Sequence, residues 1–238
     1  MSAPHKHWTV LPHEPLNAIE DNILTVVGTI KVPTGDFPRR MTVVRMRDGN
    51  AVVFNGIALD EDEMYELEGF GRLTCLIVPN DHHRLDAKIW KDRYPAMTII
   101  APAGAREKVA KVVPVDAVDV TFADPAVRFV TVPGMHMHEA ALEVHGPNGV
   151  TLVLNDIVAN IRHPHGFGGW MLRLMGFAGE TPHVPAPVKL AIGKGKVDLA
   201  AQLRTWAALP LKRIIVSHGE TIDDDPKAAL LALAATLD

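Results

Sequence analysis

The chain has 238 residues, of which 47% are hydrophobic and 22% charged, as is usual for a globular protein with a sizeable core. Its formal net charge of −4 and the absence of long like-charge blocks argue against a nucleic-acid-binding protein. The single cysteine, Cys75, excludes an intrachain disulfide and fits a reducing compartment such as the cytoplasm. The sequence has neither a signal-peptide core nor an apolar run near ~20 residues, so we expect no export and no membrane span.

The first half of the chain is predicted to mix strands with helices. Residues 23–32 and 41–46 are expected strands, joined by a loop at "PTGDFP". Asp48-Gly49 predicts a hairpin turn, because glycine tolerates the positive φ that such a turn needs. Acidic residues at the start of "LDEDEMYELEGFG" favour a helix there. Further strands are predicted at 73–78 and 97–101, and further helices at 87–94 and in "GAREKVAKVV".

The second half repeats this mixture. Short strands are predicted at 118–122, 127–132, 141–144 and 150–154, followed by an irregular segment rich in Gly and Pro at 159–195. Asp198 caps a predicted helix through residue 209, a strand follows at 213–216, and "DDPKAALLALAATL" predicts a closing helix. Two β-rich halves, each with helices, predict a pair of sheets flanked by helices in a single domain, 1–238.

Polar residues with the chemistry of metal ligands follow several of the predicted strands. The segments are "NDHHRLD" after residues 73–78, "VPGMHMHE" at 132–139, "LNDIV" at 154–158 and "VSHGE" at 216–220. Asp156 directly follows a buried apolar strand, where an unpaired carboxylate would be costly. Gly219 permits a sharp turn that leaves His218 at the strand's edge.

This order of strand-end residues resembles the metallo-β-lactamase fold superfamily, an αββα four-layer sandwich with metal ligands on loops at one edge of two sheets. Within it, the chain is similar to an uncharacterised domain family of unknown function. The features that carry this second likeness are Pro79-Asn80, His82-His83, Trp90 and Tyr94-Pro95. The resemblance extends from about residue 41 to the C-terminal helix.

The chain departs from the superfamily's His-x-His-x-Asp-His pattern. An alignment on the preceding strand places Asn80, His82, Arg84 and Leu85 at the four ligand positions, so only one ligand remains. Met135 follows the Pro-Gly pair where the next metal histidine normally stands. His136 and His138 come just after it, on one face if the segment is a strand. Asp156 and His218 match the bridging aspartate and the last histidine of the superfamily.

The resemblance implies at most one divalent metal ion, zinc by preference, held by ligands drawn from His82, His136, His138, Asp156 and His218. Asn80, His83, Arg84 and Trp170 are further candidates for the pocket. A one-residue shift of the loop would make His83 the ligand in place of His82. Arg84 either turns inward and pairs with Asp156, replacing a missing metal, or lies in solvent at a helix start.

The segment "GFGGWMLRLMGFAG" has apolar residues at helical spacing between glycines. It predicts a short helix over 166–179, within the irregular segment 159–195, which either covers the edge of the core or acts as a lid over the pocket.

Two functions fit these features. The resemblance implies a metal-dependent hydrolase of a small carbonyl substrate, an ester, lactone or thioester, that uses metal-activated water. The alternative is a metal-free pseudoenzyme of the same fold that binds a small-molecule ligand or a partner. The sequence assigns neither a catalytic residue beyond the metal ligands nor an oligomeric state.

Overall fold

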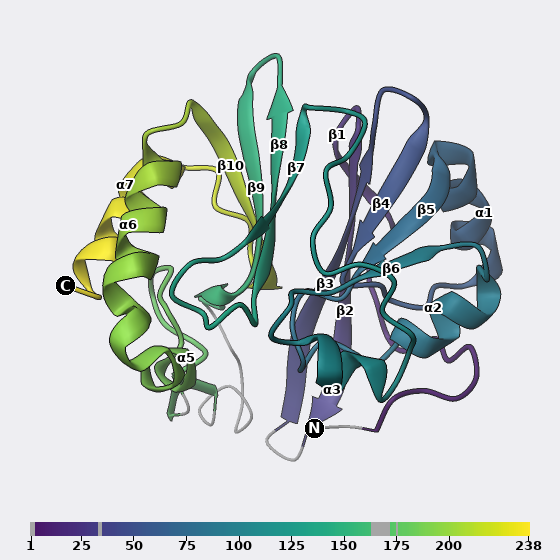
Figure 1. Ribbon diagram of the computed structural model, residues 1–238, viewed down its shortest axis with the longest axis horizontal. Helices are drawn as coiled ribbons and strands as arrows, with labels where there is room; N and C mark the ends of the chain where they lie inside the picture. The colour runs from purple at the N-terminus through teal and green to yellow at the C-terminus, as the bar shows by residue number, and fades with distance from the viewer. Residues whose placement is uncertain (1–2, 33–34, 163–171, 175) are drawn as a thin grey trace.

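A computed structural model of the protein describes residues 3–32, 35–162, 172–174 and 176–238. Two β-sheets lie face to face, and helices cover their outer sides, with α6 and α7 at one end of the view and α1 and α2 at the other (Figure 1). The αββα sandwich predicted from the sequence is confirmed. None of the helices in the described ranges is long and apolar enough to cross a membrane.

The first sheet has its strands in chain order. They are β1 (Asn17–Glu20), β2 (Ile23–Val32), β3 (Gly35–Arg45), β4 (Asn50–Phe54), β5 (Arg72–Ile77) and β6 (Thr98–Ile100). Its outer face packs on α1 (Glu61–Phe70) and α2 (Ala87–Arg93), and α3 (Arg106–Ala110) follows β6. Met64 and Leu67 of α1 and Trp90 of α2 are fully buried in this outer core.

The second sheet has the order β10-β9-β8-β7. Its strands are β7 (Val127–Thr131), β8 (Ala140–Gly146), β9 (Gly149–Asn160) and β10 (Leu211–Gly219), with β10 parallel to β9. The helices of this half are α5 (Ala186–Ile192), the short η1 (Gly193–Gly195), α6 (Lys196–Ala207) and α7 (Pro226–Ala235). Leu203 and Trp206 of α6 and Leu230 of α7 are buried in its outer core.

A third apolar cluster fills the space between the sheets. Phe54 and Ile77 come from the first sheet, and Leu142 and Ile215 come from the second. At 25 cal/mol per Å² of apolar surface, burial of this kind is the main force that holds the two sheets together.

Two of the sequence predictions are wrong in detail. Strand β3 begins at Gly35 rather than at residue 41, so most of the predicted "PTGDFP" loop is strand. Pro38 is tolerated there because β4 pairs only with residues 42–45 of β3, which leaves Pro38 beside β2 alone. Residues 118–122 form no strand and continue as irregular chain after a bridge between Ile100 and Ala117.

Strand β9 is longer than predicted and contains an irregularity that matters for the site. Its pairing with β10 passes from Leu154 opposite Val216 to Ala159 opposite His218. Residues 155–158 of β9 therefore correspond to a single residue of β10, Ser217. A bulge of this kind bends a strand and redirects its side chains. Asp156 lies in this bulge rather than beyond the strand's end.

Candidate metal centre

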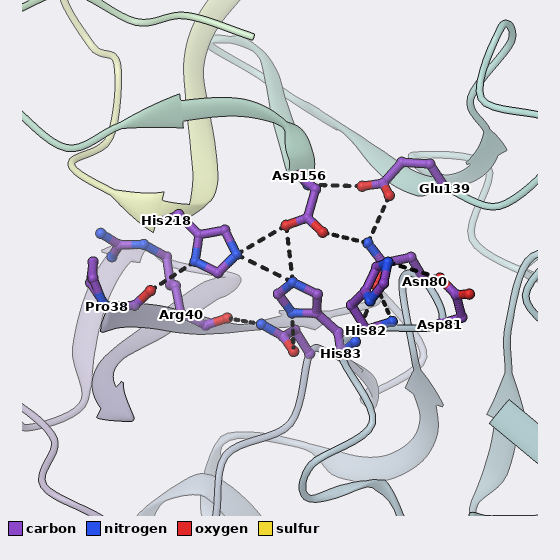
Figure 2. Close-up of polar contacts among 10 residues, drawn as sticks. Pro38, Arg40, Asn80, Asp81, His82, His83, Glu139, Asp156 and His218 are labelled. Atoms are coloured by element: carbon purple, nitrogen blue, oxygen red, sulfur yellow. Dashed lines mark hydrogen bonds and ion pairs between the residues drawn. The ribbon is translucent and has the colours of Figure 1, made fainter. Parts of the chain in front are cut away.

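Three polar side chains meet at one edge of the two sheets. His83 lies in the loop after β5, Asp156 in the bulge of β9, and His218 near the end of β10 (Figure 2). Oδ1 of Asp156 is 3.0 Å from Nε2 of His83 and 3.0 Å from Nε2 of His218, and the two Nε2 atoms are 3.2 Å apart. Their side chains are only 11%, 16% and 6% exposed, in the order His83, Asp156, His218.

The turn after β5 selects which of the two adjacent histidines joins this cluster. Oδ1 of Asn80 accepts hydrogen bonds from the backbone N–H groups of His82 and His83, at 2.8 and 3.1 Å. An asparagine that bonds to backbone two and three residues ahead folds the chain into a tight turn. In this turn the His83 ring points to Asp156, whereas the His82 side chain is 55% exposed.

The hydrogen bonds of His83 fix its protonation pattern. Nδ2 of Asn55 donates to the carbonyl of Arg40 at 2.8 Å, which leaves Oδ1 of Asn55 facing Nδ1 of His83 at 3.0 Å. We therefore assign the proton of the neutral ring to Nδ1 of His83, since a carbonyl oxygen can only accept. The lone pair on Nε2 then points into the cluster.

His218 is held in the same manner. Its Nδ1 lies 2.7 Å from the carbonyl oxygen of Pro38, so Nδ1 carries the proton and Nε2 of the neutral ring carries the lone pair. Arg40 crosses from β3 to β10, where Nε donates to the carbonyl of Val216 at 3.1 Å and Nη2 to that of Gly219 at 2.8 Å. These bonds fix the strand end that carries His218.

Asp156 is oriented by Asn80 and Glu139. Because Oδ1 of Asn80 faces backbone donors, its Nδ2 is free to donate to Oδ2 of Asp156 at 2.7 Å and to Oε2 of Glu139 at 2.9 Å. The backbone N–H of Asp156 donates to Oε1 of Glu139 at 2.9 Å. Asp156 therefore uses Oδ2 within the protein and directs Oδ1 to the histidines.

The electrostatics favour an ionised carboxylate beside neutral imidazole. Burial lowers the pKa of His83 and outweighs the pull of Asp156 in the other direction. Burial acts to raise the pKa of Asp156, but its interactions with His83 and His218 hold it well below its ordinary value. Burial and the charge of Asp156 raise the pKa of Glu139 well above its ordinary value, so Glu139 is the protonated member of the carboxyl pair.

The trio therefore consists of three acceptor atoms that face one another. In tetrahedral zinc sites with bonds of 2.0–2.1 Å, neighbouring ligand atoms lie roughly 3.3 Å apart. The separations here, 3.0, 3.0 and 3.2 Å, are close to that value. Two imidazole nitrogens and one carboxylate oxygen also match the donor chemistry of divalent zinc. The residues present fit a single divalent ion.

The other histidines considered from the sequence lie outside this trio. Nε2 of His82 is 3.5 Å from Oδ1 of Asp81, and Nδ1 of His138 is 3.9 Å from Oδ2 of the same residue. The ammonium group of Lys108 pairs with the carboxylate of Asp81. Burial acts to raise the pKa of Asp81, but Lys108 and the two histidines hold it below its ordinary value. His136 lines the same pocket, with its backbone at φ 49°. The segment 135–138 is a turn, so the argument that His136 and His138 share a strand face does not apply.

Arg84 lines the pocket, and the pairing with Asp156 that was one of its two alternatives is not among its contacts. Its Nη1 donates to the carbonyl of Lys108 at 2.6 Å. The side chain of Asp156 instead accepts a hydrogen bond from Asn80 and lies 3.0 Å from the Nε2 atoms of His83 and His218. Trp170 lies outside the described residues, as does half of the predicted helix 166–179. Within that range, residues 172–174 are helical, and Leu172 and Phe177 line the pocket.

Sequence reasoning missed Asn55 and Glu139. Asn55 follows β4 directly and has φ 60°, a left-handed conformation that asparagine tolerates better than most residues. Its position after an apolar strand was the available signal. Glu139 was not among the candidates, and it is only 2% exposed. Its burial depends on contacts with Asn80 and Asp156 that no local pattern shows.

The cluster opens into a pocket of about 920 Å³, within the usual range for small-molecule sites. The pocket is lined in part by polar residues of the loop after β5 and of the turn before β8. The rest of its lining includes the apolar residues Ile30, Val32, Phe37, Leu172, Phe177, Val188, Ala191 and Ile192. This combination can bind a carbon skeleton and present one polar group to His83, Asp156 and His218.

The fold is that of the metallo-β-lactamases. The chain is similar to the DIM-1 metallo-β-lactamase exposed to ceftazidime, with a TM-score of 0.64, 14% identity and coverage of 97% of this chain and 100% of that one. It is also similar to the metallo-β-lactamase FIM-1 from Pseudomonas aeruginosa in its mono-zinc form (TM-score 0.60, 11% identity, 95% and 96% coverage). A metallo-β-lactamase from Hirschia baltica gives a TM-score of 0.59 at 12% identity, with 94% and 98% coverage. No family model and no curated protein matches the sequence.

Proposed function

We propose that the protein is a metal-dependent hydrolase of a small carbonyl substrate, an ester, lactone or thioester. His83, Asp156 and His218 would hold one divalent ion, zinc by preference. The observation that carries the proposal is the convergence of three acceptor atoms within 3.2 Å, with both ring protons committed to outward carbonyl oxygens. Like acceptors repel at this distance unless a cation lies among them.

A divalent ion bound there would polarise a carbonyl group and lower the pKa of water toward ~7. The residues of the chain hold and aim its ligands. Asn55 and the carbonyl of Pro38 fix the two rings, and Asn80 fixes Asp156 through Oδ2. Such outer hydrogen bonds set ligand orientation and typically affect metal affinity 10–100-fold. Three protein ligands would leave a fourth position for water or substrate, as in catalytic zinc sites.

The test combines metal content with turnover. Protein purified without an affinity tag is analysed for bound metal, and zinc is titrated calorimetrically into the chelator-treated protein. We expect one zinc ion per chain and hydrolysis of at least one member of an ester, lactone and thioester panel. His218→Ala should remove both properties. His145→Ala, at a histidine outside the pocket lining, is the matched control and should change neither.

A metal-free ligand-binding protein of the same fold is the second candidate. The observation that favours it is the placement of His82, His136 and His138 outside the trio, while Lys108 pairs with Asp81 beside them. The ammonium group of Lys108 thus occupies the position beside Asp81 that a metal ion would take if these residues were its ligands. Absence of zinc uptake by the intact protein would decide for this candidate.

A further inference from the structure

We infer that the acyl part of the substrate is an aliphatic chain rather than a small polar group. The inference rests on the proposed hydrolase function and concerns the substrate class of the same site. It is carried by the apolar part of the pocket lining, which includes Phe37 beside His218 and residues of helix α5.

Phe37 is the first residue of this apolar wall. Its ring centroid lies 4.6 Å from that of His218 and 5.4 Å from that of Phe177, with the two phenylalanine rings perpendicular. Phe37 and Phe177 pack in turn against a buried cluster that includes Leu172. Hydrocarbon surface therefore starts directly beside the trio, without an intervening charged side chain in this series of contacts.

Helix α5 supplies another part of the wall. Val188, Ala191 and Ile192 line the pocket, and Ile192 is also buried in the outer core of the second sheet, which anchors the helix. Leu190 is on the same helix but outside this lining, and it is 85% exposed. The helix thus presents one apolar surface to the pocket and has a different residue available as an internal control.

The charged side chains of the pocket lining include two ion pairs. Lys108 is paired with Asp81, and Arg39 with Asp86. A polar substrate tail against Phe37, Phe177 and α5 would lose water without gaining a partner, which is unfavourable. A methylene chain on the same surface gains roughly 0.8 kcal/mol per buried CH₂, which corresponds to about a fourfold change in affinity.

The test is a chain-length series with zinc-loaded protein. The substrates are 4-nitrophenyl esters from acetate to decanoate, each used below its micelle concentration, and the readout is kcat/KM. We expect kcat/KM to rise up to about fourfold per added methylene until the chain fills the wall. Calorimetric titration with acetate, hexanoate and decanoate measures the same preference without turnover.

Two variants locate the effect on α5. Ala191→Asp places a charge on the pocket wall and should flatten the chain-length dependence, with a loss of at least about tenfold for the decanoate ester and little change for the acetate ester. Leu190→Asp, one residue away and outside this pocket lining, should keep the wild-type dependence. Circular dichroism checks that both variants keep the fold.

The results separate this inference from the proposed function. Hydrolysis with a flat chain-length series would overturn the inference and leave the hydrolase standing. A series that rises equally in wild type, Ala191→Asp and Leu190→Asp would also overturn it. Binding of decanoate over acetate that Ala191→Asp weakens, in protein without hydrolytic activity, would support the apolar pocket and remove the hydrolase.

Discussion

Nε2 of His83 and Nε2 of His218 lie 3.2 Å apart, although 135 residues separate them in the chain. Each ring uses its Nδ1–H in a bond to a fixed oxygen, so the two facing nitrogens carry lone pairs in the neutral state. The relationship has a simple chemical meaning, because two lone pairs and a carboxylate oxygen are stable together only around a cation. The predictions that follow test whether that cation is a metal.

The two adjacent histidines should differ sharply in their effect on zinc binding. His83→Ala removes one of three ligands, and we expect zinc affinity to fall more than about 100-fold, since loss of an outer hydrogen bond alone costs 10–100-fold. His82→Ala is the matched control, because the His82 side chain is 55% exposed and lies outside the trio. Zinc titration calorimetry measures both. Equal losses of zinc affinity in the two variants would contradict the assignment of His83, rather than His82, as the ligand.

Asn55 should act on the metal through His83. Asn55→Gly keeps a residue that tolerates φ 60° but removes the acceptor of the His83 Nδ1 proton. We expect zinc affinity to fall about 10–100-fold with the fold intact. The ¹⁵N chemical shifts of the His83 ring should also show a mixture of tautomers in the variant. Unchanged affinity together with an unchanged tautomer would contradict the role assigned to Asn55.

The fold was predictable because its signals are local. Apolar runs bounded by Gly and Pro predicted most of the strands, and the acidic start of α1 and the Asp-Pro start of α7 predicted helices. The stretch at 118–122 is as apolar as a strand, but its ladder partners depend on tertiary contacts. Pro38 similarly looked like a loop residue because the sequence does not show that β4 ends before it.

The site was predictable only in part. Asp156 and His218 could be inferred because each follows an apolar run, which brings them to the edge of the buried sheets. Whether His82 or His83 faces the site depends on the turn at Asn80, whose side chain accepts hydrogen bonds from the backbone N–H groups of both histidines. The alternation of side chains along a strand therefore does not apply to this loop. The hydrogen bond from Arg84 to the carbonyl of Lys108 joins residues 24 apart in the chain, and local spacing carries no information about it.

Glu139 should make the apoprotein less stable as the pH rises. Its pKa is raised in the native state, so above about pH 4.5 the native state keeps a proton that the unfolded state releases. Glu139→Gln removes this loss. The free energy of unfolding of the variant should gain on wild type by up to about 1.4 kcal/mol per pH unit above that pH. Urea unfolding at pH 5, 6 and 7 measures the difference, and a constant difference would contradict the assignment.

The pair formed by Arg39 and Asp86 should be a strong determinant of stability. Their side chains are 7% and 0% exposed, and burial raises the pKa of Asp86 against the pull of Arg39. Asp86→Ala leaves the guanidinium buried without its partner, and we expect a loss of about 3–5 kcal/mol in unfolding free energy. Asp92→Ala breaks the exposed pair with Lys88 and should cost less than about 1 kcal/mol. Similar losses for the two variants in urea titrations would contradict the burial of the first pair.

Zinc affinity should fall as the pH falls, because the ligand nitrogens also bind protons, which compete with zinc for Nε2. Because burial lowers the pKa of His83, proton competition at this ring should begin only below its ordinary value of about 6.5. The pKa of Asp156 is held well below its ordinary value, so its carboxylate remains ionised throughout that range. We therefore expect proton competition at His83 to weaken zinc binding more between pH 6.5 and 5.5 than between pH 8 and 7.

Calorimetry in buffers of different ionisation enthalpy counts the protons that zinc displaces. At pH 7.5 we expect few from His83, because burial lowers the pKa of that ring. Release of a full proton at that pH would show that the trio holds a proton between its acceptors in place of a metal. The short distances would then be those of a protonated histidine pair on Asp156, and the metal-free ligand-binding protein would become the better account of the fold.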